Sequence, residues 1–95
     1  MIYTNVEARV NPQKWKVLQD TYNEVQRSTL PEALLSSHLV QDEADPNLWR
    51  IVTFWKSKKD MDEYRMSVDV PAWFKVFRSA DAEPQLSISE VIITK

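Results

Sequence analysis

The 95 residues of this chain include no glycine, and this absence restricts fold and chemistry more than any other feature. Average usage would place roughly six or seven glycines in a chain of this length. Glycine is the usual residue where the backbone turns left-handed or approaches a ligand closely. The sequence therefore excludes the P-loop, the dinucleotide-binding fingerprint and hairpin turns that depend on glycine. A nucleotide, flavin or nicotinamide would have to bind by other means.

Composition narrows the class of protein further. Hydrophobic residues make up 43% of the chain and the net charge is −2, which is typical of one ordinary globular domain over residues 1–95. Its only basic cluster is Lys56, Lys58 and Lys59, so a nucleic-acid surface is not expected. It has no cysteine for a disulfide or a thiolate site. Because no signal peptide or apolar run of roughly 18 residues is present, we expect a cytoplasmic protein without a membrane span.

The first 31 residues predict a strand followed by an amphipathic helix. Residues 2–10 alternate between apolar and polar, a pattern typical of a strand with one polar face. Asn11 and Pro12 then provide a helix cap and a proline suited to the first helical turn. Residues with helical spacing on one side continue to about residue 28, namely Trp15, Leu18, Tyr22 and Val25. Leu30 and Pro31 end this helix.

The rest of the chain predicts three strands and a helical region. Residues 33–41 and 48–56 are the second and third strands, separated by a polar turn at 42–47. Ser57 begins a helix with Asp60 in its first turn, and a second helical piece begins at Pro71. Residues 86–94 form the last strand. The order β-α-β-β-α-β predicts an α+β, ferredoxin-like fold, a four-stranded antiparallel sheet with its helices on one face.

Two of these strands are apolar on both sides. The third carries Trp49, Ile51 and Trp55 on one side and Leu48, Val52 and Phe54 on the other. The fourth carries Leu86, Ile88 and Ile92 against Val91 and Ile93. Since the helices cover one face only, a monomer would expose an apolar patch of the kind that marks interfaces. We therefore expect a homodimer whose sheets face each other.

In this arrangement the chain resembles the antibiotic biosynthesis monooxygenase superfamily, within the dimeric α/β-barrel group. The resemblance covers nearly the whole chain. Its motifs are the turn and strand at residues 45–52, the strand end at residues 54–57 (Phe-Trp-Lys-Ser), Tyr64 in the next helix, and Trp73 with Phe74 beyond it. Glu32 and Ala33 depart from the Pro-Gly that members often have at this place.

The resemblance implies an activity and candidate residues. Members include enzymes that oxidise aromatic polyketide anthrones or quinols with dioxygen and with no metal or flavin, so no cofactor is expected. In those enzymes an asparagine on the first strand and the tryptophan ending the third are implicated, which makes Asn5 and Trp55 the candidate catalytic residues. Other relatives open haem and need a histidine after Tyr64. No histidine follows His38 here, so haem degradation is less favoured.

Aromatic residues are the main candidates for binding a small hydrophobic or aromatic molecule. Seven of the ten fall between Trp49 and Phe77, where they could hold a planar ligand between sheet and helices. The predicted ligand contacts are Phe54, Tyr64, Trp73 and Phe77. Core packing is the ordinary alternative for each. Trp55 is the best pocket candidate, because a cleft can open at a strand end and its indole N–H needs a partner.

Asn5 and His38 are the polar candidates. The Asn5 amide could hold a carbonyl or phenolate oxygen of a substrate, or it could face solvent beside Glu7 and Arg9. His38, predicted to contact substrate, could act as a general base, or it could be a half-exposed strand residue. It has no neighbouring ligands at metal-binding spacing, so we expect no metal site.

The leading functional hypothesis is a cofactor-independent monooxygenase acting on a small aromatic, quinone-like or polyketide-derived compound. Its alternative is a non-catalytic metabolite-binding or stress-associated dimer that uses the same pocket. An absence of polar groups converging beside Trp55 would favour that alternative.

Overall fold

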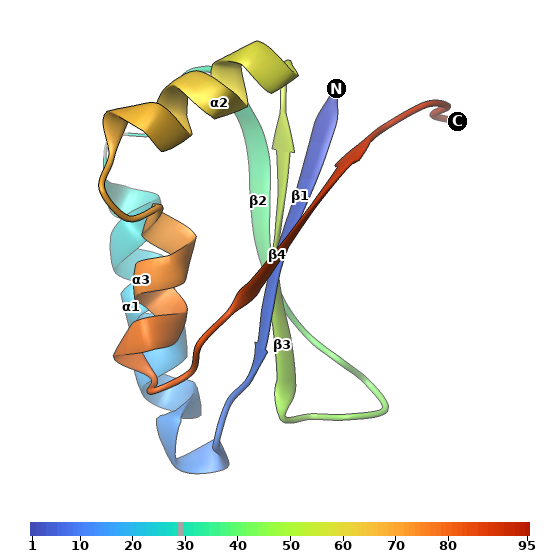
Figure 1. Ribbon diagram of the computed structural model, residues 1–95. Helices are drawn as coiled ribbons and strands as arrows, with labels where there is room; N and C mark the ends of the chain where they lie inside the picture. The colour runs from blue at the N-terminus through green and yellow to red at the C-terminus, as the bar shows by residue number, and fades with distance from the viewer. Residues whose placement is uncertain (29) are drawn as a thin grey trace.

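The computed structural model describes residues 1–28 and 30–95, and within them three α-helices pack on one side of a four-stranded sheet (Figure 1). The elements in chain order are β1 (Ile2–Arg9), a short 3-10 helix (Pro12–Lys14), α1 (Trp15–Arg27), β2 (Leu34–Gln41), β3 (Leu48–Trp55), α2 (Lys58–Ser67), α3 (Ala72–Ser79) and β4 (Gln85–Glu90). This order confirms the predicted β-α-β-β-α-β arrangement, with the second helical region divided into α2 and α3.

The sheet is antiparallel throughout, with strand order β2-β3-β1-β4. The fold is therefore α+β and ferredoxin-like, as predicted. We call the side that carries Val6 and Trp55 the helix face, because α1, α2 and α3 all lie against it. The side that carries Tyr3 and Phe54 is the open face, and no element covers it among the described residues (Figure 1).

The alternation in β1 decides which side chains each face receives. Ile2, Thr4, Val6 and Ala8 are buried on the helix face, whereas the residues between them are half-buried on the open face. A period of two places successive side chains on opposite faces, so the buried row is apolar except for Thr4. This part of the fold follows directly from the sequence pattern.

Two helix starts are capped as the sequence predicts. Oδ1 of Asn11 accepts a hydrogen bond from the backbone N of Gln13 at 2.9 Å, just before the 3-10 helix. Oγ of Ser57 accepts one from the backbone N of Asp60 at 3.2 Å and donates to Oδ2 of Asp60 at 2.7 Å. These bonds satisfy N–H groups that have no partner within the helix.

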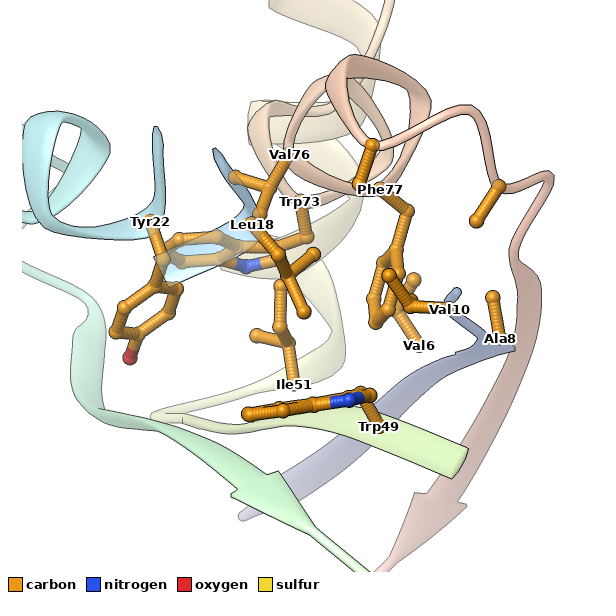
Figure 2. Packing of buried hydrophobic residues seen from close by; sticks show 12 residues of the cluster. Val6, Ala8, Val10, Leu18, Tyr22, Trp49, Ile51, Trp73, Val76 and Phe77 are labelled. Carbon is orange, nitrogen blue, oxygen red and sulfur yellow. The ribbon is translucent and has the colours of Figure 1, made fainter. Parts of the chain in front are cut away.

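The main core lies between the helix face and the pair α1 and α3 (Figure 2). Leu18 from α1 and Val76 and Phe77 from α3 are fully buried against Val6 and Ile51 of the sheet. Each such side chain stabilises the fold by roughly 1.5–3 kcal/mol relative to exposure. Helix α2 lies beyond this core and contributes one buried side chain, Met61, to a second cluster with Ile2 and Trp55.

The prediction of a last strand over residues 86–94 is wrong at its C-terminal end. The β4 ladder with β1 runs from the pair Glu7 and Gln85 to the pair Ile2 and Glu90. Beyond Glu90 the backbone N of Val91 still donates to the O of Met1 at 2.9 Å, but the regular pairing with β1 has ended. Residues Ile92 and Ile93 are 79% and 80% exposed. Since Val91, Ile92 and Ile93 lie outside β4, the expected apolar character on both of its faces is also wrong.

Candidate functional site

A small cavity lies between the helix face of the sheet and helices α2 and α3. Its lining comes from β1, β3, β4, both helices and the segment between them, and consists of Thr4, Val6, Trp55, Met61, Tyr64, Arg65, Pro71, Trp73, Phe74 and Leu86. The cavity volume is about 30 Å³, which is room for about two water molecules. Pockets that hold drug-sized ligands measure roughly 300–1,000 Å³. A planar aromatic ligand can therefore enter only if part of the lining moves outward.

Trp55 is the residue that the end of β3 places in this cavity. It is 2% exposed and packs against Ile2 and Met61. Its ring lies 5.4 Å from the ring of Tyr64, with an angle of 37° between the planes. Phe54, the preceding residue, points to the open face, because successive strand residues alternate. The sequence-based expectation that the two residues face opposite sides is confirmed.

Tyr64 and Trp73, two of the predicted ligand contacts, join Trp55 in the lining. Oη of Tyr64 accepts a hydrogen bond from the backbone N of Ala72 at 3.3 Å, which connects α2 to the first turn of α3. The phenol keeps its own proton for another acceptor. The ring of Trp73 also packs against Tyr22 of α1, with 5.6 Å between ring centroids, so this residue belongs to both the cavity and the core.

Two indole N–H groups at the cavity lack a hydrogen-bond partner among the described residues. They belong to Trp55 and Trp73, which are 2% and 4% exposed. An unsatisfied buried donor costs about 1–3 kcal/mol, and neither of these two indole nitrogens is exposed at the cavity wall. Trp49 also has an unpartnered indole N–H, but it packs edge-on against Trp15 and does not line the cavity. An unpartnered indole therefore does not mark a site by itself.

Asn5 does not lie in this cavity. It pairs with Val52 on the open face, whereas Trp55 lies on the helix face. Nδ2 of Asn5 donates to Oε1 of Glu7 at 2.7 Å, and Oδ1 of Asn5 is buried without a partner among the described residues. The two candidate catalytic residues are thus on opposite sides of the sheet, because Asn5 and Trp55 occupy positions of opposite parity in the β1–β3 register. Within one chain they cannot contact the same ligand.

The other predicted ligand contacts also divide between locations. Phe54 and His38 lie on the open face, where the Phe54 ring meets Tyr3 at 5.3 Å and His38 at 6.5 Å, both edge-on. His38 also borders an open groove between β2 and α1. Phe77 is fully buried in the main core and does not line the cavity. The residues expected to line a single pocket are therefore divided among three places: the cavity, the open face and the main core.

Charge is arranged differently on the two sides of the sheet. At the cavity, Arg65 is the one charged side chain of the lining. On the open face, Arg50 bridges Asp42 and Glu7, with Nη1 3.0 Å from Oδ1 of Asp42 and Nε 3.6 Å from Oε1 of Glu7. The backbone N–H of Asp45 and the guanidinium of Arg50 together hold the pKa of Asp42 below its ordinary value.

Sequence reasoning did not select Thr4, Arg65 or Phe74 as site residues, although all three line the cavity. A signal existed for the first two. Thr4 is the one polar residue in the apolar row of β1, and Arg65 follows Met61 by four positions, which places both on one side of α2. Phe74 carries no comparable signal, because it is one of several apolar residues of α3 and only packing decides which of them reach the cavity.

Within residues 1–28 and 30–95, no cluster of three or more histidine, cysteine, aspartate or glutamate residues is placed to hold a metal ion. In the same part of the chain, no helix combines the length and apolar character required to cross a bilayer.

Comparison with known proteins agrees with this fold. The family model for antibiotic biosynthesis monooxygenase matches residues 1–81. A candidate antibiotic biosynthesis monooxygenase from Deinococcus radiodurans superposes with a TM-score of 0.76 at 11% identity, covering 100% of this chain and 96% of that one. Another from Nitrosomonas europaea gives 0.73 at 16% identity, with 98% and 100% covered.

A Bacteroides thetaiotaomicron protein of unknown function, suggested to be an oxidoreductase, superposes with a TM-score of 0.73 at 16% identity over 95% of this chain and 96% of that one. At these identities the superpositions establish a common fold. No curated protein sequence matches the chain.

Proposed function

Because the chain belongs to the antibiotic biosynthesis monooxygenase family, we propose that it is a cofactor-independent monooxygenase. Its substrate is a small aromatic, quinone-like or polyketide-derived compound that binds in the cavity beside Trp55. The observation that supports this assignment is the cavity itself, since aromatic side chains from β3, α2 and α3 meet in its lining.

The chemistry needs no external reductant. An anthrone or quinol that has lost a proton is electron-rich and can reduce dioxygen directly. For an anthrone, the methylene carbon loses two hydrogens and gains one oxygen atom, and the second oxygen atom leaves as water with those hydrogens. The protein's contribution is to orient the substrate, favour its anion and exclude bulk water. Trp55 and Tyr64, with rings 5.4 Å apart, would hold the plane of such a compound.

Substrate entry requires the lining to open, because a volume of about 30 Å³ cannot hold an aromatic ring system. Helix α2 is the element that can move at least cost. Met61 is its one buried side chain, whereas α1 and α3 form the main core together. We infer that α2 and the segment leading to Pro71 move away from Trp55 when substrate enters.

The test is oxygen consumption by the purified chain with an anthrone and with a hydroquinone. One oxygen molecule consumed per quinone formed from the anthrone, unaffected by metal chelators and without added flavin, would support the proposal. A matched control is Trp49→Phe, which removes a buried indole outside the cavity. If each substrate consumes no more oxygen with the wild-type chain than in buffer without protein, the monooxygenase assignment is wrong.

The alternative function is a non-catalytic dimer that binds a small metabolite. A specific observation favours it: the immediate neighbours of Trp55 are mostly apolar, namely Ile2, Leu34, Met61 and Tyr64. Tight binding of an aromatic compound that leaves it chemically unchanged in air would distinguish this function from oxygenation.

We also propose that two copies associate through their open faces. The side chains of Tyr3, Val52 and Phe54 are half-buried there, and no element of the described chain packs over them. The bridge formed by Arg50 with Asp42 and Glu7 adds paired charges of both signs on the same face. A two-fold arrangement would bury these apolar side chains against their own counterparts.

A further inference from the structure

We propose that the cavity between the sheet and helices α2 and α3 is a binding site for a small apolar gas molecule, and that its natural occupant is dioxygen. The choice of dioxygen rests on the proposed function, since that reaction consumes it. The preference for a very small apolar guest does not rest on that function, because it follows from the wall and the size of the cavity.

The first observation is the chemistry of the cavity wall, which is almost wholly apolar. The indole nitrogens of Trp55 and Trp73 are buried and are not exposed at this wall. The hydroxyl of Thr4 already donates to the backbone O of Thr53, at 3.5 Å. A buried water molecule needs about two to four polar partners. The wall therefore favours a guest without hydrogen-bonding groups over water.

The two remaining polar side chains of the lining are Tyr64 and Arg65. Oη of Tyr64 accepts a hydrogen bond from the backbone N of Ala72 at 3.3 Å, so this oxygen lies at the start of α3. Arg65 is exposed, and a long cationic side chain covers apolar surface with its methylene stem while its charged end stays in water. Because the wall is almost wholly apolar, neither polar end contributes appreciably to it.

The second observation is the size of the cavity. A volume of about 30 Å³ has room for about two water molecules, and hence for a guest of about two or three heavy atoms. Dioxygen has two atoms and no dipole moment. Small apolar cavities in proteins bind guests of this kind, such as xenon. The cavity therefore admits the gas without any movement of its lining, whereas an aromatic compound requires α2 to move.

The third observation is the position of the cavity between sheet and helices. Thr4, Val6 and Leu86 form its sheet side, and Met61 of α2 lies on its helix side. If α2 moves outward, the new space opens on the helix side. Dioxygen held against the sheet would then contact an aromatic compound that lies under α2. The site thus brings both reactants of the proposed reaction together where bulk water is excluded.

The experiment records methyl NMR spectra of the full chain equilibrated with oxygen and with nitrogen. Dissolved oxygen is paramagnetic and speeds the relaxation of nuclei close to it. We expect several-fold more relaxation at the methyl groups of Val6, Met61 and Leu86, which line the cavity, than at those of Leu18 and Val25. Leu18 is fully buried and Val25 is half-buried outside the lining, so they control for burial. Equal relaxation at both sets would overturn the proposal.

Xenon provides an independent probe, because it is apolar and unreactive. It should shift the resonances of the same lining methyl groups and leave those of the controls in place. A crystal structure with an ordered water molecule in the cavity, and no xenon under pressure, would contradict the apolar site.

Variants assign the effect to this cavity. Val6→Ile adds a methylene to the wall and should reduce the relaxation caused by oxygen, whereas Met61→Ala enlarges the cavity and should let it bind benzene. Val25→Ile makes the same change as Val6→Ile outside the lining and should have no effect. Undiminished relaxation in Val6→Ile would overturn the assignment. The measurements on the wild-type chain test the proposal even if a variant fails to fold.

Oxygen consumption with an anthrone separates this inference from the proposed function. Xenon should raise the KM for oxygen and leave the KM for the anthrone unchanged. Localised gas binding without oxygen consumption would leave the inference standing and contradict the monooxygenase. Oxygen consumption without localised gas binding would support the monooxygenase and contradict the inference.

Discussion

At the residue scale, Trp49 and Trp55 form a matched pair for testing the site. Both are buried, both lie on β3 and both have an unpartnered indole N–H among the described residues, but only Trp55 lines the cavity. We expect Trp49→Phe and Trp55→Phe each to lower the free energy of unfolding by about 1–3 kcal/mol. Only Trp55→Phe should also change the quenching of fluorescence by a quinone. If both variants changed ligand binding to the same extent, Trp55 would contribute to core packing only.

The Asn5→Ala variant tests which face of the sheet binds the substrate. If the substrate binds in the cavity, Asn5→Ala should change the turnover rate little, because its amide is on the open face. If the substrate binds on the open face, loss of a hydrogen bond to a developing oxyanion should lower kcat by about 10²–10³. We expect the first result. Steady-state oxygen uptake, compared with the neighbouring Glu7→Gln variant, makes the distinction.

At the element scale, α2 is held by its N-cap, by the buried Met61 and by the contacts of Tyr64 with Trp55 and Ala72. Ser57→Ala removes the bond to the backbone N of Asp60 and should destabilise the start of α2 by about 0.5–2 kcal/mol. Amide hydrogen exchange in α2 should accelerate while that in α1 and α3 stays unchanged, and bound aromatic ligand should slow it again. Ser28→Ala, at the end of α1, is the control. Uniform acceleration across the three helices would contradict a separately opening α2.

The turn between β2 and β3 depends on an ionised Asp42. Oδ2 of Asp42 accepts from the backbone N of Asp45 at 2.8 Å, and Oδ1 accepts from Arg50 at 3.0 Å. These bonds lower the pKa of Asp42 below its ordinary value of 3.8. The carboxylate therefore stabilises the fold above that value, and its contribution is lost as the pH falls through the lowered pKa.

Asp42→Asn should consequently reduce stability at pH 7, and the difference from wild type should diminish in strong acid. Urea unfolding at pH 7 and at pH 3 measures both quantities. Glu43→Gln, at the exposed neighbouring residue, should show little change at either pH. A destabilisation by Asp42→Asn that is the same at every pH would assign the effect to packing rather than to charge.

At the scale of the whole molecule, the uncovered sheet face predicts self-association. Sedimentation at micromolar concentration should give twice the chain mass of 11.2 kDa. Phe54→Asp should shift the population toward monomer, because it places a charge among half-buried apolar side chains. Met66→Asp is the control, since Met66 is an 86% exposed apolar side chain on the helical side. A wild-type monomer would contradict the proposed interface.

Much of this architecture could be predicted from local patterns. The alternation in β1, the caps at Asn11 and Ser57, and the helical spacing in α1 each depend on residues close together in the sequence, and each is confirmed. The end of β4 could not be predicted in this way. Residues 91–93 have strand-forming side chains, but a strand also needs a partner, and the pairing with β1 ends at Glu90.

What the sequence by itself determined is the order of elements and the face on which each strand side chain lies, because periods of two and 3.6 are local properties of the chain. The division of Phe54 and Trp55 between two faces belongs to this category. Only the tertiary structure decided which candidate residues meet. The register of β1 against β3 separates Asn5 from Trp55, and the packing of α2 and α3 brings Tyr64, Arg65 and Trp73 to the cavity. These contacts join segments far apart in the chain, so their geometry depends on how helices and sheet pack and not on any local pattern.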